Sequence, residues 1–167
     1  MYEKLIFDIK TRIKSNALVT ELYSGIGTIG LTLAEKSKEV RLCELEPHAE
    51  PFFALAKNCL ALELQNKLSY KVGKAEDCLE LLQGANVCVV DPPRKGLGEA
   101  LIQKILSTKG LTQVAYVSCE WKSLERDLDF IHIHFKDWKV TWSSSYLFFP
   151  GTNQIETLVM LENSTGL

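Results

Sequence analysis

Cys119 and Glu156 are the two side chains of this sequence whose types and positions suggest covalent and acid–base chemistry. Cys119 ends an apolar run and precedes a helical pattern, and a thiol at a helix start can have a lowered pKa and act as a nucleophile. Glu156 lies in an otherwise apolar stretch, where a carboxylate either points to solvent by alternation or is held for proton abstraction. The residues alone leave both roles open, since cysteine is most often buried and inert.

A glycine-rich turn between a short apolar run and a helical pattern is a candidate cofactor loop. Tyr23 precedes it, and Gly25, Gly27 and Gly30 have the loose G-x-G-x-x-G spacing. Glycine admits backbone angles closed to other residues and lets a ligand approach the main chain. Free N–H groups from Thr28 onward would face that ligand. The pattern is typical of a nucleotide-like cofactor site, although a turn without a ligand can have the same spacing.

Glu44 follows the next apolar run, about sixteen residues after Thr28, where a ribose-binding acid is expected. Its carboxylate could accept hydrogen bonds from both ribose hydroxyls of an adenosine. Glu46 is a nearby competitor that falls further into the following turn. An exposed glutamate at a strand end is the alternative interpretation.

Asp91 follows an almost wholly apolar run and opens a proline-rich loop with Pro92 and Pro93. Two prolines stiffen such a loop and hold the preceding aspartate in an extended conformation. The loop is suited to holding a flat base or a ligand charge, and Arg94 and Lys95 offer positive charge for a phosphate. A stiff surface turn without a ligand has the same composition.

Strand and helix patterns alternate along the chain and must position these residues. Alternation of this kind predicts an α/β fold, a parallel sheet with helices on both faces and ligands at the carboxyl ends of its strands. The expected strands are residues 17–22, 39–43, 68–72, 86–90 and 113–117, followed by an antiparallel pair at 138–147 and 155–161. The expected helices are residues 2–14, 28–34, 47–62, 75–82, 99–107 and 121–130.

Composition narrows the possible classes of protein. The chain has 167 residues, is 46% hydrophobic and carries a net charge of −2, which fits one domain without a strongly basic surface. Its apolar runs are short, so no membrane span is expected. Five scattered cysteines fit a reducing, cytoplasmic compartment. His132 and His134, expected on one face of an extended segment, have no third ligand spaced for a metal, so no metal site is expected.

Four motifs in order resemble the catalytic domain of the RNA 5-methyluridine methyltransferases, over nearly all of the chain. The resemblance implies a single Rossmann-like class I S-adenosylmethionine-dependent methyltransferase domain over residues 1–167, with a mostly parallel seven-stranded sheet and a C-terminal antiparallel strand pair. The motifs are Leu22–Thr28, Asp91–Leu97, Val117–Cys119 with the helix residues Leu124–Leu128, and Phe149–Thr157.

The resemblance implies methylation of C5 of a uridine in tRNA or rRNA. Cys119 would add to C6 of the uracil, and Glu156 would remove the C5 proton. S-adenosylmethionine would be held by Tyr23, Gly25, Gly27, Thr28, Glu44 and Asp91, with a weaker expectation for Ala75 or Glu76 near the adenine. Asp91, Pro92 and Arg94 would contact the RNA substrate, whose target base must leave its stack.

Two departures from the family pattern bear on activity. Glu120 and Trp121 stand where the family usually has Asn-Pro, and a carboxylate beside the nucleophile would raise the thiol pKa. The family's upstream RNA-binding segments have no counterpart before Tyr2, which suggests a catalytic-domain fragment that depends on a separate RNA-binding domain or partner protein.

Two other classes of function remain open at this point. A catalytically weak or inactive S-adenosylmethionine-binding module acting with a partner protein is compatible with Glu120 and Trp121. A nicotinamide-dependent dehydrogenase is compatible with the glycine loop, but gives the Asp91 loop and the terminal strand pair no role.

Overall fold

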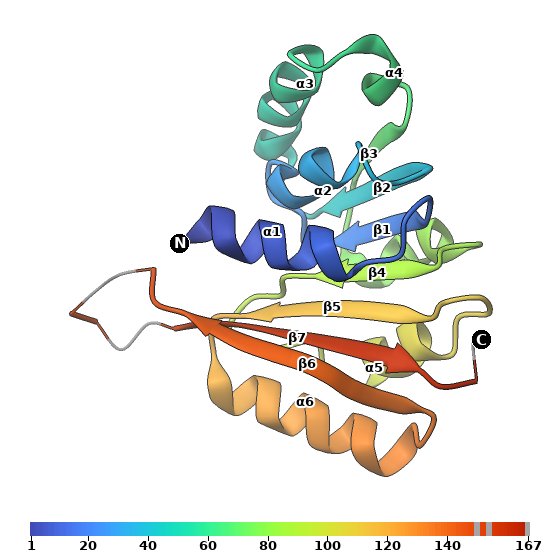
Figure 1. Ribbon diagram of the computed structural model, residues 1–167, viewed down its shortest axis with the longest axis vertical. Helices are drawn as coiled ribbons and strands as arrows, with labels where there is room; N and C mark the ends of the chain where they lie inside the picture. The colour runs from blue at the N-terminus through green and yellow to red at the C-terminus, as the bar shows by residue number, and fades with distance from the viewer. Residues whose placement is uncertain (149–150, 153–154, 166–167) are drawn as a thin grey trace.

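The computed structural model describes residues 1–148, 151–152 and 155–165, and its core is one seven-stranded sheet (Figure 1). Across the sheet the strands lie in the order β3-β2-β1-β4-β5-β7-β6. The strands are β1 (Leu18–Leu22), β2 (Glu39–Glu44), β3 (Leu68–Val72), β4 (Val87–Val90), β5 (Gln113–Ser118), β6 (Trp138–Tyr146) and β7 (Glu156–Asn163).

Strands β1 to β5 are parallel, and β7 enters antiparallel between β5 and β6. Every residue of β4 and β5 is buried, so both faces of these two strands are covered. The mostly parallel sheet with a C-terminal antiparallel pair confirms the expected fold class. The connection between β6 and β7 includes residues 149–150 and 153–154 of the fourth motif, which lie outside the described residues.

Helices cover both faces of the sheet and form two cores. One core packs α1 (Tyr2–Arg12), α2 (Thr28–Leu33) and α3 (Glu50–Asn58) against the sheet. The other core packs the turn η3 (Leu79–Leu82), α5 (Glu99–Leu106) and α6 (Trp121–His134) against the opposite face. Figure 1 shows the start of α1 on the side of the sheet where β1, β4 and β5 end. Side chains at that edge can therefore come from both the sheet and α1.

The prediction of one continuous helix over residues 47–62 is wrong. The segment consists of a 3₁₀ turn η1 (Pro47–Ala49), α3 and a separate short α4 (Leu62–Gln65). Pro51 has no N–H to donate to the carbonyl of Pro47, so a regular α-helical turn cannot run through this point. Ala61 is extended and separates α3 from α4.

Two other helix predictions need correction. The expected helix over 75–82 is two 3₁₀ turns, η2 (Ala75–Asp77) and η3, interrupted at Cys78. Helix α6 runs to His134, so His132 and His134 are helical rather than extended. The alternation of isoleucine and histidine is typical of a strand, which is why an extended segment was expected. In the helix, Ile131 is buried and Ile133 is 58% exposed, because residues two apart lie on different faces of a helix.

Neither a membrane helix nor a metal cluster is present in the described ranges. Over residues 1–148, 151–152 and 155–165, no helix is both long and apolar enough to cross a bilayer. In the same part of the chain, no group of three histidine, cysteine or acidic side chains could hold a metal ion.

Candidate functional site

The register of β5 and β7 brings Cys119 and Glu156 together. Ser118 is paired with Thr157 in this antiparallel ladder, so the next position places Cys119 opposite Glu156. Residues directly opposite in antiparallel strands have neighbouring side chains on the same face. The two residues proposed to do covalent and acid–base chemistry are therefore cross-strand neighbours.

Asp91 joins this pair from the adjacent strand. Val90 is paired with Tyr116 in the parallel β4–β5 ladder, which places Asp91 beside Val117, two residues before Cys119. Alternation puts Asp91 on the face of Val89, which packs under α1 and α2. A triad of Asp91, Cys119 and Glu156 thus gathers at one edge and on one face of the sheet.

Desolvation disfavours ionisation of all three groups of this triad, and neighbouring carboxylates add to the effect at Cys119 and Asp91. The pKa of the Cys119 thiol is raised by burial and then by the carboxylates of Glu156 and Asp91, while Arg94 opposes the rise. Burial raises the pKa of Glu156. Asp91 is exposed at the open cavity, and its pKa is raised to about 7 by desolvation from the surrounding protein, helped by Glu156 and Glu44. These effects favour the protonated thiol of Cys119 over the thiolate.

The carboxylates that chiefly raise the pKa of Cys119 are Glu156 and Asp91 rather than the expected Glu120. The Glu120 carboxylate caps α6 by accepting a hydrogen bond from the backbone N–H of Lys122 at 3.4 Å. The thiol pKa is raised, as expected, but by the carboxylates of Glu156 and Asp91 in addition to burial. Glu120 was expected to act on the thiol because it is the next residue in the sequence. The pairing of β5 with β7 instead places the Glu156 carboxylate beside Cys119. The neighbouring Trp121 is 60% exposed at the start of α6.

The glycine loop is held open beside this triad. Tyr23 and Gly25 have φ of 61° and 54°, and an added Cβ on Gly25 would meet no atom within 4 Å. The Gly25 N–H donates to Glu44 Oε2 at 2.7 Å, and the Tyr70 hydroxyl donates to the Gly25 carbonyl at 2.7 Å. The turn is therefore fixed by strands β2 and β3 while its outer surface stays clear for a ligand.

A cavity of about 690 Å³ lies against this loop, within the size range of small-molecule and cofactor sites. Its lining includes four of the expected cofactor residues and both residues of the weaker adenine expectation: Tyr23, Gly25, Glu44, Asp91, Ala75 and Glu76. The lining also includes Glu46, which the sequence offered as a competitor of Glu44. The other lining residues were not expected from the sequence as cofactor contacts and come from the segments after β2, β3 and β4: Leu45, Lys74, Asp77, Pro93 and Lys95.

The chemistry of the lining fits an adenosine-type ligand. Glu44 accepts backbone hydrogen bonds from Gly25 and Glu46, one on each oxygen, which leaves a lone pair on each oxygen for a ribose hydroxyl. Leu45 is half exposed and offers an apolar wall beside that position. Gly25 leaves open the space that a side chain would fill.

The remaining expected residues lie around the cavity rather than on its lining. Gly27 is buried, and a Cβ there would come within 2.7 Å of the Phe53 ring, so its glycine is required for packing as well as for its φ of 84°. Thr28 begins α2 and interacts with the Tyr2 hydroxyl. Pro92 is buried, whereas Arg94 is exposed.

Glu21 is a buried acid that sequence reasoning overlooked. It is 1% exposed, and its Oε2 accepts the Gly30 N–H at 2.8 Å. Burial raises the pKa of Glu21 to about 8, with smaller contributions from Asp91 and Glu44. The available signal was a charged residue inside the apolar strand Leu18–Leu22.

Fold and site together define a class of protein: the chain has the Rossmann-like class I methyltransferase fold, with an open cavity at the carboxyl edge of its sheet. No protein-family model matches the chain. Sequence relatives are nevertheless clear. An uncharacterized RNA methyltransferase of Protochlamydia amoebophila is 36% identical over 162 residues, covering 97% of this chain and 42% of the relative.

A second relative carries the same description, and solved methyltransferases share the fold. An uncharacterized RNA methyltransferase of Listeria monocytogenes is 34% identical over 86% of this chain and 31% of its own length, so the chain spans well under half of these curated relatives. The Pyrococcus abyssi tRNA (uracil-54, C5)-methyltransferase, solved with S-adenosyl-L-homocysteine, superposes with a TM-score of 0.75 at 24% identity, covering 95% of this chain and 37% of that one. An rRNA methylase of Streptococcus thermophilus superposes with a TM-score of 0.68 at 17% identity. The superposition covers 98% of this chain and 94% of that one.

Proposed function

We propose that this chain is the catalytic domain of an S-adenosylmethionine-dependent RNA methyltransferase. The observation that carries the proposal is the meeting of the cavity at the Gly25 loop with the triad of Asp91, Cys119 and Glu156 at one sheet edge. Relatives at 34–36% identity that are named RNA methyltransferases support it. A nicotinamide dehydrogenase gives this triad no role.

The cofactor would bind in the cavity, with Glu44 accepting from its ribose and Tyr23, Gly25 and Asp91 lining its path. S-adenosylmethionine would supply the transferred methyl group. Gly27 and Thr28 support the loop from beneath, and Ala75 and Glu76 line the part of the cavity proposed for the adenine. In this proposal the protein's contribution is to orient the ligand and limit its access to water.

The finer proposal is methylation of a uracil base at C5 in tRNA or rRNA, producing 5-methyluridine. C5 of uracil is a weak nucleophile, and addition of the Cys119 thiolate to C6 would make it an enolate carbon that can accept the methyl group. Glu156 would then take the C5 proton, so that the C5–C6 double bond reforms and the Cys119 sulfur leaves with its electron pair. Asp91 lies between the cavity and this pair and would position both reactants.

RNA would reach the site as an extruded nucleotide, because both faces of the base must be open to the two reacting groups. Arg94 and Lys95 are exposed beside the triad and could contact phosphates, while Pro92 is buried and would act by stiffening the loop. A net charge of −2 supplies no broad basic surface. We therefore propose that RNA affinity comes largely from a separate domain or partner, and that the protein acts in the cytoplasm.

The proposal is tested first by titration of the purified chain with S-adenosylhomocysteine. Glu44→Ala should abolish binding, because it removes both the ribose acceptor and the anchor of Gly25. Glu46→Ala is the matched control, since that carboxylate lines the same cavity without holding the loop. Equal binding by wild type and Glu44→Ala would contradict the assignment of the site.

Methyl transfer to RNA that lacks 5-methyluridine tests the chemistry. Wild type should label the RNA and form a covalent adduct with 5-fluorouridine RNA, and Cys119→Ala should do neither. Labelling that survives Cys119→Ala would exclude the uracil-C5 mechanism while leaving another RNA methylation open.

A cofactor-binding module without catalysis is the second candidate. The observation that favours it is the raised pKa of Cys119, because two neighbouring carboxylates oppose the thiolate needed for attack. Binding of S-adenosylhomocysteine with no labelling of any RNA, even with an added RNA-binding domain, would support this alternative.

A further inference from the structure

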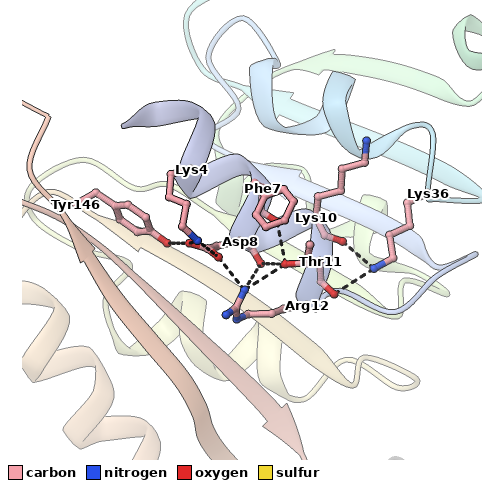
Figure 2. Close-up of polar contacts among 8 residues, drawn as sticks. All are labelled: Lys4, Phe7, Asp8, Lys10, Thr11, Arg12, Lys36 and Tyr146. Atoms are coloured by element: carbon pink, nitrogen blue, oxygen red, sulfur yellow. Dashed lines mark hydrogen bonds and ion pairs between the residues drawn. The ribbon is translucent and has the colours of Figure 1, made fainter.

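A buried aspartate joins helix α1 to the strand pair that carries Glu156. Asp8 is 2% exposed and faces the sheet, 138 residues away in sequence from the Tyr146 hydroxyl that donates to its Oδ2 at 2.8 Å. Lys4 Nζ donates to Oδ1 at 2.7 Å, and Arg12 Nη1 to the same oxygen at 2.9 Å (Figure 2). These donors satisfy a charge whose burial would otherwise be strongly unfavourable.

Asp8 is ionised and acts only as an acceptor. Burial by itself would raise its pKa, but the hydrogen bonds from Lys4 and Tyr146 and the charges of Lys4 and Arg12 bring the pKa below its ordinary value. Tyr146 must therefore donate, and its hydroxyl has a defined orientation. The Arg12 guanidinium also stacks on Trp142 of the same strand, 3.6 Å from the ring centroid.

Tyr146 and Glu156 form the last described pair of the β6–β7 ladder. Directly opposed residues point to the same face, here the face covered by α1, where Tyr146 packs with Leu158. Beyond this pair the ladder gives way to the connection between the strands, and ladder ends are where strands fray most easily. Glu156 is therefore coupled to Tyr146 on one side, as it is to the β5 ladder on the other.

We propose that the Asp8–Tyr146 hydrogen bond is a positioning contact for Glu156. This inference rests on the proposed function, in which Glu156 takes the C5 proton. Clamping the last pair against α1 keeps the carboxylate opposite Cys119, where a displacement of about 1 Å can cost on the order of a hundredfold in rate. The Tyr2 ring of the same helix, 5.8 Å from Phe148 between centroids, adds a second contact at this end of β6.

The effect should fall on one step of the reaction. Attack by Cys119 and methyl transfer do not use Glu156, whereas release of the Cys119 sulfur requires loss of the C5 proton. A displaced Glu156 should therefore let the methylated protein–RNA adduct accumulate on ordinary uridine RNA. A general loss of structure would instead lower cofactor binding and adduct formation together.

Tyr146→Phe tests the inference because it removes only the hydroxyl and leaves Asp8 paired with Lys4 and Arg12. We expect the lifetime of the methylated adduct, measured by denaturing electrophoresis, to rise at least about tenfold, in the direction of Glu156→Gln. Tyr116→Phe is the matched control: that buried tyrosine donates to buried Asp127 at 2.7 Å on the other face of the sheet. It should lose similar stability without prolonging the adduct. Titration with S-adenosylhomocysteine confirms that each variant is folded.

Asp8→Asn is a second test of the contact, because the amide keeps an oxygen acceptor for Tyr146 but loses the negative charge that strengthens the hydrogen bond. This variant should prolong the lifetime of the adduct less than Tyr146→Phe does. If Glu156→Gln accumulates adduct and Tyr146→Phe does not, the positioning role is wrong and the proposed function stands. If neither wild type nor Glu156→Gln ever forms an adduct, the proposed function itself fails. An equal effect of Tyr116→Phe would reduce the contact to a general contribution to stability.

Discussion

At the scale of single residues, the site is dominated by carboxylates that oppose one another and the thiol. Asp91 and Glu156 each raise the pKa of Cys119 in addition to burial, and Arg94 is the cation that acts in the opposite sense. A nucleophile in such surroundings is stable as a thiol and becomes reactive only when a neighbouring negative charge is removed or compensated. In the proposed function, the positive charge of a bound S-adenosylmethionine would supply such compensation.

Neutralising Asp91 should make Cys119 easier to ionise. In Asp91→Asn the pH midpoint for alkylation of Cys119 by iodoacetamide should fall, because a negative charge beside the thiolate is lost. Peptide mass spectrometry follows Cys119 separately, and the exposed Cys59 in the same sample monitors the reagent. An unchanged midpoint would show that Asp91 does not act on the thiol.

At the scale of elements, the strand-to-helix turn after β1 separates two uses of glycine. Gly27 is enclosed, and a Cβ there would come within 2.7 Å of Phe53 and 2.9 Å of Leu42. Gly25 has a positive φ but open space around it, on the side that lines the cavity. Gly27 serves the packing of α2 and α3 on the sheet, whereas Gly25 keeps the cavity open.

Alanine at these two positions should therefore have different effects. Gly27→Ala should destabilise the fold by about 2–4 kcal/mol through overpacking and strained φ. Gly25→Ala should cost about 1 kcal/mol from its φ alone, yet weaken S-adenosylhomocysteine binding strongly because the methyl group enters the ligand's space. Urea unfolding and calorimetric titration of both variants provide the comparison. Similar stability losses would contradict this distinction.

At the scale of the whole molecule, the sheet edge collects acidic groups that are costly to ionise in the folded state. Glu21 is the most buried of them, and its folded pKa of about 8 lies well above its ordinary value of 4.5. The folded protein therefore holds a proton that the unfolded chain releases at lower pH. Its contribution to stability is complete below about pH 4.5 and is lost as pH rises through about 8.

Glu21→Gln should flatten the dependence of stability on pH. Wild type should lose up to about 1.4 kcal/mol per pH unit from this one group between roughly pH 5 and 8, and the amide variant should lack that component. Thermal unfolding across this range measures the difference. Identical slopes for the two proteins would show that Glu21 is not protonated in the fold.

Local patterns in the sequence were sufficient for the fold class, the strands and the glycine loop with its acid partner at the cavity. Apolar runs of strand length located β1 to β5, and the spacing of Gly25 and Glu44 after β1 and β2 located the loop and its acid partner. These features follow from periodicity and backbone geometry within a few residues, so they can be read along the chain. The split of residues 47–62 at Pro51 was also present in the sequence and was missed.

Tertiary structure alone decided which distant residues meet and which of them hold protons. The antiparallel entry of β7 beside β5 sets Glu156 opposite Cys119, and the packing of α1 on β6 sets Asp8 against Tyr146. Desolvation and neighbouring carboxylates then raise the pKa of Glu21 and Asp91, whereas hydrogen bonds and cations from α1 and β6 lower that of Asp8 despite its burial. Both outcomes depend on contacts between segments far apart in the chain and on the exclusion of water from them, which no local pattern encodes.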